Sequence, residues 1–159
     1  MYYKQNYERW TLEDKMELIS NSLISLDVDL DSKEALVEKL ADLLEENSRL
    51  NDRERYIHDV FERENIISTC VGDMIVIPHA ITEGVKAASL LYIRLKEPID
   101  WNDADQAKYI LGIAVPADNV DNQHLMILSS VAKKLLDDTI KNKLFTSTSK
   151  EEILAALLD

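Results

Sequence analysis

Three histidines, His58, His79 and His124, offer side chains suited to chemistry near neutral pH. A neutral imidazole carries a free lone pair and titrates close to neutrality. His58 lies in the helix-like stretch "RERYIHDVFERE", on a charged shoulder beside the apolar face, where a solvated histidine is the simplest interpretation. His79 follows the β-prone run "MIVIP". Because Pro78 lacks a backbone donor, we expect this strand to end there and His79 to emerge at its carboxyl end, where ligand sites form in α/β sheets.

His124 and Arg63 are the other residues with chemical potential, although each also has a purely structural interpretation. His124 falls in the first turn of a predicted helix that opens at Asp121 or Asn122, where free backbone N–H groups favour an anion. Arg63 lies at the end of a predicted helix, where a cation stabilises the helix dipole. The paired N–H groups of its guanidinium also match the oxygens of a phosphate. A strand end near Pro116 precedes the His124 helix, so two strand ends with two histidines could face one cleft.

The segments that must position these side chains are strands and helices in a mixed order. Alternation in "LISLDVDLD" predicts a half-buried strand over 24–30, and we expect further strands at 74–77, 88–95 and 108–115. A helix is expected over 33–46, with Asp31 as cap and Glu34 reaching back. Asn51 and Glu54 form the same kind of predicted N-cap, for a helix that ends near Arg63 or Glu64.

Helices are also expected at both ends of the chain. A short one covers 12–20, a longer one runs from 121 or 122 to about 137, and two more follow at 139–145 and after the Ser149–Glu152 cap. The inward stripe predicted for the longer helix is Leu125, Leu128, Ala132 and Leu135. Helices around a run of strands indicate an α/β fold with a mixed parallel and antiparallel sheet and helices on both faces. We expect residues 1–10 to form an N-terminal extension and residues 11–159 to form a single domain.

Charge and composition exclude several classes of function. The chain has 159 residues and a net charge of -12, which disfavours nucleic-acid and anionic-membrane binding. The same charge either steers the protein toward a basic protein partner or only aids solubility. Cys70 is the single cysteine, so no disulfide or cysteine metal cluster can form within the chain. Without an apolar run long enough for a bilayer, and with the polar start "MYYKQNYERW", we expect a cytoplasmic protein.

The stretch "ERENIISTCVGDMIVIPHA", followed by "HLMILSSVAKKLLDD", resembles the enzyme IIA domain of the fructose–mannitol class of the bacterial sugar phosphotransferase system. The resemblance runs from about residue 12 to 158. The family pattern falls on Glu64, Val71, Gly72, Ile75, Val76, Ile77, Pro78, His79 and Ala80. Val76 stands where alanine is usual, and Cys70 stands where glycine is common after Thr69.

The resemblance implies an α/β fold of the type-2 IIA kind, with a mixed central sheet of about five strands. It implies that His79 accepts a phosphoryl group, on Nε2, from phosphorylated HPr and passes it to a cysteine of a IIB domain. Arg63 would stabilise the phosphoryl oxygens and His124 would hydrogen-bond to them. Supporting roles are expected for Thr69, Glu64 and Pro78. No metal or organic cofactor is implied.

Three further expectations concern the surroundings of the site and the biological role. Cys70 is expected to be a small core or turn residue, and Ile81 and Met126 are either an apolar docking rim or part of the core. The resemblance implies a sugar-specific phosphocarrier, coupled to uptake of a fructose-like sugar or a polyol. The alternatives are a nitrogen-type IIA protein that regulates its partners by binding them, and an interaction domain without phosphorylation, which the intact histidine–arginine trio disfavours.

Overall fold

A mixed five-stranded sheet forms the centre of the molecule: the order of elements predicted a mixed sheet, and the family resemblance implied about five strands. The computed structural model describes residues 18–158; the expected extension 1–10 and most of the expected helix 12–20 lie outside the described residues. The strands are β1 (Ile24–Val28), β2 (Ile75–Val76), β3 (His79–Thr82), β4 (Ser89–Asp100) and β5 (Gln106–Pro116). Their order is β1-β4-β5-β2, and β3 also pairs with β5. The pairs β1–β4, β2–β5 and β3–β5 are parallel, whereas β4 and β5 are antiparallel.

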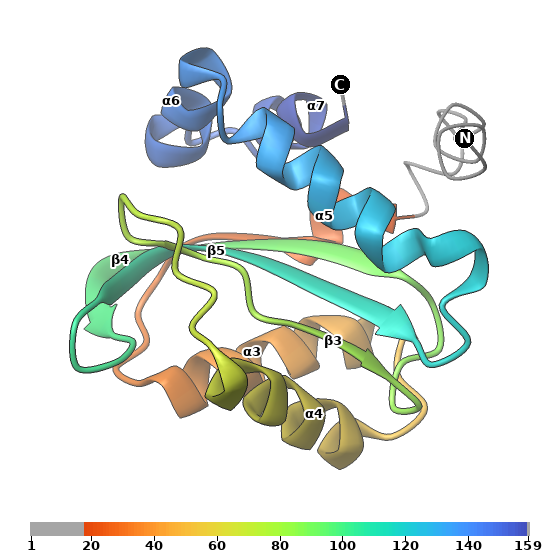
Figure 1. The fold of residues 1–159 in the computed structure, drawn as a ribbon. Helices are drawn as coiled ribbons and strands as arrows, with labels where there is room; N and C mark the ends of the chain where they lie inside the picture. Colours follow the sequence, from red (N-terminus) through yellow and green to blue (C-terminus); the bar gives the residue numbers. More distant parts are fainter. Residues whose placement is uncertain (1–17, 159) are drawn as a thin grey trace.

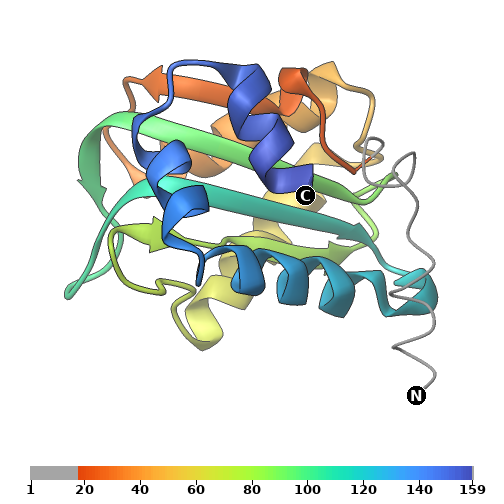
Figure 2. The same ribbon diagram turned by 90° about the horizontal axis from the view of Figure 1, so that it is seen from above.

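Helices cover both faces of this sheet, as expected. On one face lie α3 (Lys33–Glu46) and α4 (Arg53–Ile66), and on the other lie α5 (Gln123–Lys134), α6 (Asp138–Thr146) and α7 (Lys150–Leu158) (Figure 1). Two short 3-10 helices, Asn21–Leu23 and Val120–Asn122, precede β1 and α5. Seen from above, α5 runs along the side of the sheet formed by β3 and β5 (Figure 2).

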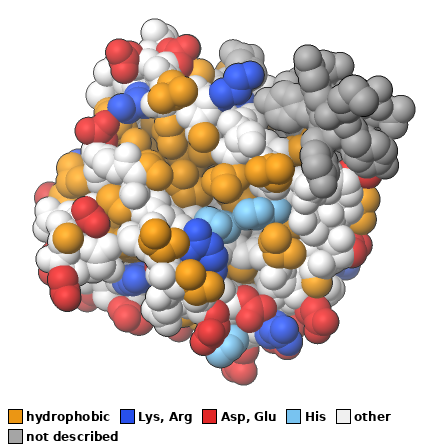
Figure 3. Space-filling model, in the orientation of Figure 1, with side chains coloured by type: hydrophobic (Ala, Val, Ile, Leu, Met, Phe, Trp, Pro, Cys, Tyr) orange, Lys and Arg blue, Asp and Glu red, His pale blue; other side chains and the backbone are white. Residues whose placement is uncertain are grey.

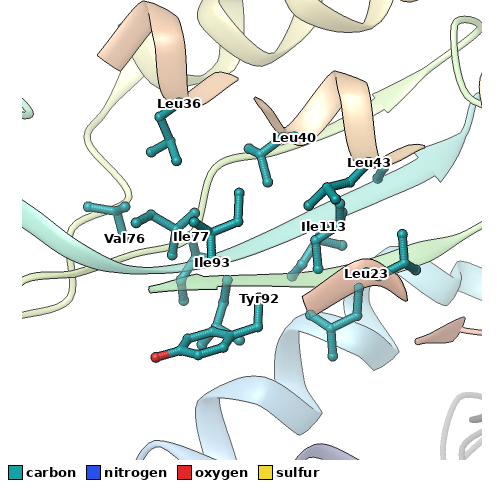
Figure 4. Packing of buried hydrophobic residues seen from close by; sticks show 14 of the residues in the cluster. Leu23, Leu36, Leu40, Leu43, Val76, Ile77, Tyr92, Ile93 and Ile113 are labelled. Atoms are coloured by element: carbon teal, nitrogen blue, oxygen red, sulfur yellow. The ribbon is translucent and has the colours of Figure 1, made fainter. Parts of the chain in front are cut away.

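The core consists of two apolar layers that share the sheet. Leu36, Leu40 and Leu43 of α3 point toward the sheet, whereas Tyr92 of β4 points to the opposite face (Figure 4). Its neighbour Ile93 is also fully buried, as expected where successive strand residues alternate between two covered faces. Each buried leucine contributes about 1.5–3 kcal/mol of transfer free energy.

The helix caps differ by one residue from those predicted. The α3 N-cap is Ser32, whose hydroxyl accepts the Ala35 N–H at 3.1 Å, because the helix begins one residue later than an Asp31 cap requires. The α4 N-cap is Asp52 rather than Asn51, and it accepts the Arg55 N–H at 3.1 Å. Asn51 lies one residue too early to cap α4, and its side-chain amide donates to backbone carbonyls of the turn at residues 83–85. By contrast, the Ser149 cap is confirmed, since Ser149 Oγ accepts the Glu152 N–H at 3.2 Å.

The predicted inward stripe of α5 was right for Leu128 and Leu135, which are partly buried against the core, and wrong for the other two residues. Leu125 is 47% exposed and Ala132 is also exposed. The buried residues are Met126, Ile127 and Val131. Apolar side chains occupy more than one face of this helix, so its periodicity alone does not determine which face meets the sheet.

The strand that leads to the candidate histidine is interrupted rather than ended. β2 stops at Val76, before Pro78, as predicted, but β3 begins at His79 and pairs with the same neighbour, β5. Pro78 still accepts the Ile113 N–H at 3.1 Å through its carbonyl. His79 therefore follows the end of β2, as predicted, but it does not leave the sheet. Pro78 lacks only the N–H that would bond at one position of the strand pair, and the chain continues beyond it as β3.

Candidate functional site

The two histidines singled out in the sequence lie side by side. His79 opens β3 and His124 lies in the first turn of α5, and their ring centroids are 5.0 Å apart with an interplanar angle of 35°. The His79 residue is only 6% exposed. Figure 3 shows two adjacent histidine side chains and a basic side chain within a mainly hydrophobic area that includes a hollow, with acidic side chains toward the margin.

A backbone carbonyl determines which nitrogen of His79 carries the proton. His79 Nδ1 lies 2.7 Å from the carbonyl oxygen of Ile77. Because a carbonyl oxygen can only accept, Nδ1 is the protonated nitrogen of the neutral ring and donates this bond. The lone pair of the neutral imidazole is therefore on Nε2.

Burial and a nearby cation keep both rings neutral at neutral pH. Burial lowers the pKa of His79 from 6.5, and the charge of Arg63 lowers it further, while the Ile77 hydrogen bond and the charge of Glu64 act in the opposite direction. Burial also lowers the pKa of His124 from 6.5, with smaller contributions from His79 and Arg63. The site therefore presents uncharged imidazoles to a ligand.

An asparagine that the sequence analysis missed orients His124. Asn119 Oδ1 accepts the backbone N–H of His124 at 3.0 Å, whereas neither Asp121 nor Asn122 caps α5 through its side chain. Asn119 has a left-handed backbone (φ 44°), a conformation that asparagine tolerates better than most residues. The Nε2 of His124 is buried and has no hydrogen-bond partner within residues 18–158. A buried polar atom without a partner is rare in folded proteins and costs about 1–3 kcal/mol.

Arg63 supplies a positive charge that no described carboxylate neutralises. Its Nη1 donates to the Ile67 carbonyl at 2.9 Å, which holds the guanidinium at the end of α4. Arg53, Arg55 and Arg94 each form an ion pair with an aspartate, but among residues 18–158 no ion pair to Arg63 is formed. A half-buried arginine without a counter-ion, close enough to lower the pKa of both histidines, favours an anionic ligand.

Two of the three predicted supporting residues, Glu64 and Thr69, form a buried hydrogen-bond network that leads to Ile77, whereas Pro78 is bonded only within the sheet. The Glu64 carboxylate accepts the Thr69 N–H and the Thr69 hydroxyl, both at 2.7 Å. It also accepts the indole N–H of Trp101 at 3.1 Å. The Thr69 hydroxyl in turn accepts the Ile77 N–H at 3.2 Å. Trp101 was missed because it lies 37 residues from Glu64 in the sequence and belongs to no motif.

The remaining candidate residues divide between surface and interior. His58 is exposed and lies 3.9 Å from the Glu62 carboxylate, as expected for a solvated histidine. Cys70 is a half-buried free thiol in an isolated bridge with Val76, in agreement with its predicted turn position. Ile81 is 44% exposed and is available as a rim residue, whereas Met126 is 5% exposed and belongs to the interior.

An α/β layer structure with a neutral histidine pair and an unneutralised arginine defines a site for transfer or binding of an anionic group. The chain belongs to the family described as phosphoenolpyruvate-dependent sugar phosphotransferase system, EIIA 2, whose model matches residues 17–159. Members of this family are phosphotransfer components of that system.

Two relatives show how widely the match extends. The fructose-specific EIIA component of Haloferax volcanii is 34% identical over 139 residues, covering 86% of this chain and 90% of that protein. The crystal structure of nitrogen regulatory protein IIA-Ntr from Neisseria meningitidis has a TM-score of 0.73 and 34% identity, covering 89% and 97% of the two chains.

Other relatives share the fold or are much longer. The structure of IIA mannitol from Escherichia coli has a TM-score of 0.71 at 22% identity, covering 87% of this chain and 98% of that one. The 2-O-alpha-mannosyl-D-glycerate-specific EIIABC component of Escherichia coli is 26% identical over 89% of this chain. This chain spans only 22% of its length, and likewise 22% of the fructose-specific EIIABC component of Bacillus subtilis.

Within residues 18–158, no helix combines the length and the apolar character needed to cross a bilayer.

Proposed function

We propose that this chain is a phosphocarrier that takes a phosphoryl group from phosphorylated HPr on Nε2 of His79 and passes it to the cysteine of a cognate IIB domain. The observation that carries the proposal is the 2.7 Å contact between His79 Nδ1 and the Ile77 carbonyl, which leaves the Nε2 lone pair available. In the first transfer this lone pair forms a bond to phosphorus while the bond between phosphorus and the donor histidine breaks, and the donor nitrogen keeps that electron pair. In the second, a cysteine thiolate attacks phosphorus and the pair returns to Nε2.

The neighbouring side chains fit the needs of such a transfer. Phosphoryl transfer depends mainly on positioning and on stabilising charge at the phosphoryl oxygens. Arg63, which forms no ion pair within the described residues, supplies the charge. The buried Nε2 of His124, which has no partner in residues 18–158, supplies a donor once a phosphoryl oxygen lies beside it. The lowered pKa of His79 keeps its lone pair free at neutral pH.

The surface near the histidines suits transient protein partners. Ile81, two residues after His79 along β3, is 44% exposed, and Leu125, next to His124, is 47% exposed. Both are therefore available to a docking protein, and the net charge of -12 would attract a basic one. The complex of enzyme IIA mannitol with phosphorylated IIB mannitol, whose IIA domain has this fold with a TM-score of 0.72, supports a IIB domain as the acceptor.

A direct experiment tests the carrier function. The protein is incubated with enzyme I, HPr and phosphoenolpyruvate in the cytoplasmic pH range, and intact mass is recorded. We expect an adduct of one phosphoryl group that acid removes and base does not, because phosphohistidine has this stability. His79→Gln should abolish the adduct, and His58→Gln, at an exposed position, should leave it unchanged. No adduct on the wild-type protein, or a labelled His79→Gln variant, would overturn the proposal.

A regulatory role is the second candidate, because IIA-Ntr from Neisseria meningitidis matches this chain at 34% identity, as does the fructose-specific relative. Transfer from the phosphorylated protein to purified IIB domains separates the two roles. Rapid loss of the label to a fructose-type or mannitol-type IIB supports sugar uptake. A label that no IIB removes, on a protein that captures a partner only in one phosphorylation state, supports regulation.

A further inference from the structure

A buried carboxylate lies behind the histidine pair. Glu64 is 6% exposed and lies in the last turn of α4, next to Arg63. Its two oxygens receive three donors: the Thr69 N–H, the Thr69 hydroxyl and the Trp101 indole N–H. Every one of these contacts uses Glu64 as acceptor, which is the pattern of an ionised carboxylate. Hydrogen bonds to an ionised group are shorter and stronger than neutral ones.

A continuous series of hydrogen bonds connects this carboxylate to the imidazole of His79. The Thr69 hydroxyl donates to Glu64 and accepts the Ile77 N–H, which also lies 3.2 Å from the Thr69 carbonyl. The Ile77 carbonyl oxygen then accepts a hydrogen bond from the N–H at His79 Nδ1. The N–H and the carbonyl of Ile77 belong to adjacent peptide groups, so the series acts by fixing the position of Ile77.

Ile77 needs such an anchor because the backbone around it has few alternatives. Residues 69–77 form a small hairpin, with a Cys70–Val76 bridge and a tip at Gly72, Asp73 and Met74, all of positive φ. Pro78 offers no N–H to the sheet at the next position. The hydrogen bonds between Thr69 and Ile77 at the base of the hairpin therefore fix the position of the Ile77 carbonyl that faces His79.

We propose that Glu64 is a positioning residue: through Thr69 it holds the Ile77 carbonyl against His79 Nδ1, and so keeps the reactive lone pair on Nε2. The same carboxylate ties the end of α4, which carries Arg63, to the strand that carries His79. The hydrogen bond from the Trp101 indole N–H connects Glu64 to the loop between β4 and β5 as well. The consequence for phosphoryl transfer rests on the proposed function, whereas the consequence for the tautomer does not.

The first test compares Thr69→Val with Thr69→Ser by nitrogen NMR of the protein labelled with ¹⁵N histidine, at a pH where His79 is neutral. Serine keeps the hydroxyl and valine removes it at nearly constant volume. We expect the Nδ1–H tautomer to dominate in the wild-type and Thr69→Ser proteins. In Thr69→Val the ratio of Nδ1–H to Nε2–H should fall by roughly twofold to tenfold, as for the loss of one ordinary hydrogen bond. An unchanged ratio in Thr69→Val would overturn the proposal.

The second test uses Glu64→Gln, with Glu62→Gln as the matched control on the exposed side of the same helix. Glutamine places an NH2 group where the site supplies only donors, so Glu64→Gln should show the same tautomer shift, and Glu62→Gln should not. The maximal rate of phosphoryl uptake from phosphorylated HPr should fall with it, roughly twofold to tenfold, at unchanged KM, because Glu64 is buried from any partner. A rise in KM at unchanged maximal rate would contradict positioning.

The two readouts separate this inference from the proposed function. The tautomer ratio requires no phosphoryl donor. If the wild-type protein accepts no phosphoryl group, the carrier function fails, and the NMR comparison still decides the role of Glu64. If Glu64→Gln does not fold, the Thr69 pair decides it.

Discussion

Replacing Gly84 with alanine should destabilise the protein strongly, because the fold leaves no room for a Cβ there. A Cβ built on Gly84 would lie 2.6 Å from the Asp52 carbonyl oxygen and 2.7 Å from the Tyr56 nitrogen. These atoms form the first backbone hydrogen bond of α4, at 3.1 Å. The Gly84 carbonyl also accepts the N–H groups of Asn51 and Asp52, at 2.7 and 3.1 Å. Neither neighbour is a flexible side chain, so the backbone at the start of α4 or in the turn that carries Gly84 must move.

The expected cost is at the upper end of the range for overpacking, about 3 kcal/mol. In a chain of this size, 1 kcal/mol corresponds to about 2–4 °C in Tm, so Gly84→Ala should melt about 6–12 °C below the wild type. Thermal unfolding followed by circular dichroism, with urea titration as a second measure, gives this shift.

Two other glycines provide matched controls. A Cβ on Gly112 would meet a Leu40 methyl at 2.9 Å, and that side chain can turn away. A Cβ on Gly72 would meet nothing within 4 Å, but its φ of +95° disfavours alanine by about 1–2 kcal/mol. Both variants should therefore lose less stability than Gly84→Ala. A Gly84→Ala protein that melts within about 2 °C of the wild type, or above both controls, would refute this account of how α4 is seated.

Three further predictions concern the site and the sheet. Arg63→Met should slow phosphoryl uptake by roughly 10²–10³-fold in rapid-quench measurements, with Arg63→Lys less affected; equal rates would remove its charge-stabilising role. The pKa values of His79 and His124 are lower in the folded protein than the ordinary value of 6.5 that they have in the unfolded chain. The folded state is therefore favoured fully above about pH 6.5, where both residues are neutral in both states. This contribution to the free energy of unfolding is lost as the pH falls through the lowered pKa values. The urea midpoint should therefore fall between pH 7 and 5, and fall less when both residues are replaced by glutamine; an equal fall would contradict the sign. Arg94→Met should cost about 1–3 kcal/mol in urea unfolding, since buried Arg94 bonds Asp27 and the Leu144 carbonyl; a midpoint within error of wild type would contradict this.

The sequence contained enough to predict the class of the fold and the residues at the centre of the site. Alternation and capping signals placed the main strands and helices, because they depend on local geometry. The chemistry of their side chains and their places at the ends of predicted elements made His79, His124 and Arg63 candidates, and the resemblance to the IIA family pattern supplied the role expected of each. The structure brings the two histidines into contact and places Arg63 close enough to affect the pKa of both.

The parts that could not be predicted depend on contacts distant in the sequence or on the backbone. The carbonyl that sets the tautomer of His79 belongs to Ile77, and no side-chain pattern reveals a carbonyl. Trp101 reaches Glu64 only because the β4–β5 loop folds back toward the end of α4. The buried face of α5 is decided by how the helix sits on the sheet, since its sequence offers apolar side chains in more than one direction.

NMR can identify the nitrogen atom that carries the phosphoryl group. The protein is labelled with ¹⁵N histidine, phosphorylated through enzyme I and HPr, and studied by phosphorus and nitrogen NMR. We expect a single phosphorus signal coupled to Nε2 of His79, while Nδ1 keeps its proton and its hydrogen bond to the Ile77 carbonyl. Phosphorus coupled to Nδ1 of His79, or to a nitrogen of His124 or His58, would contradict it.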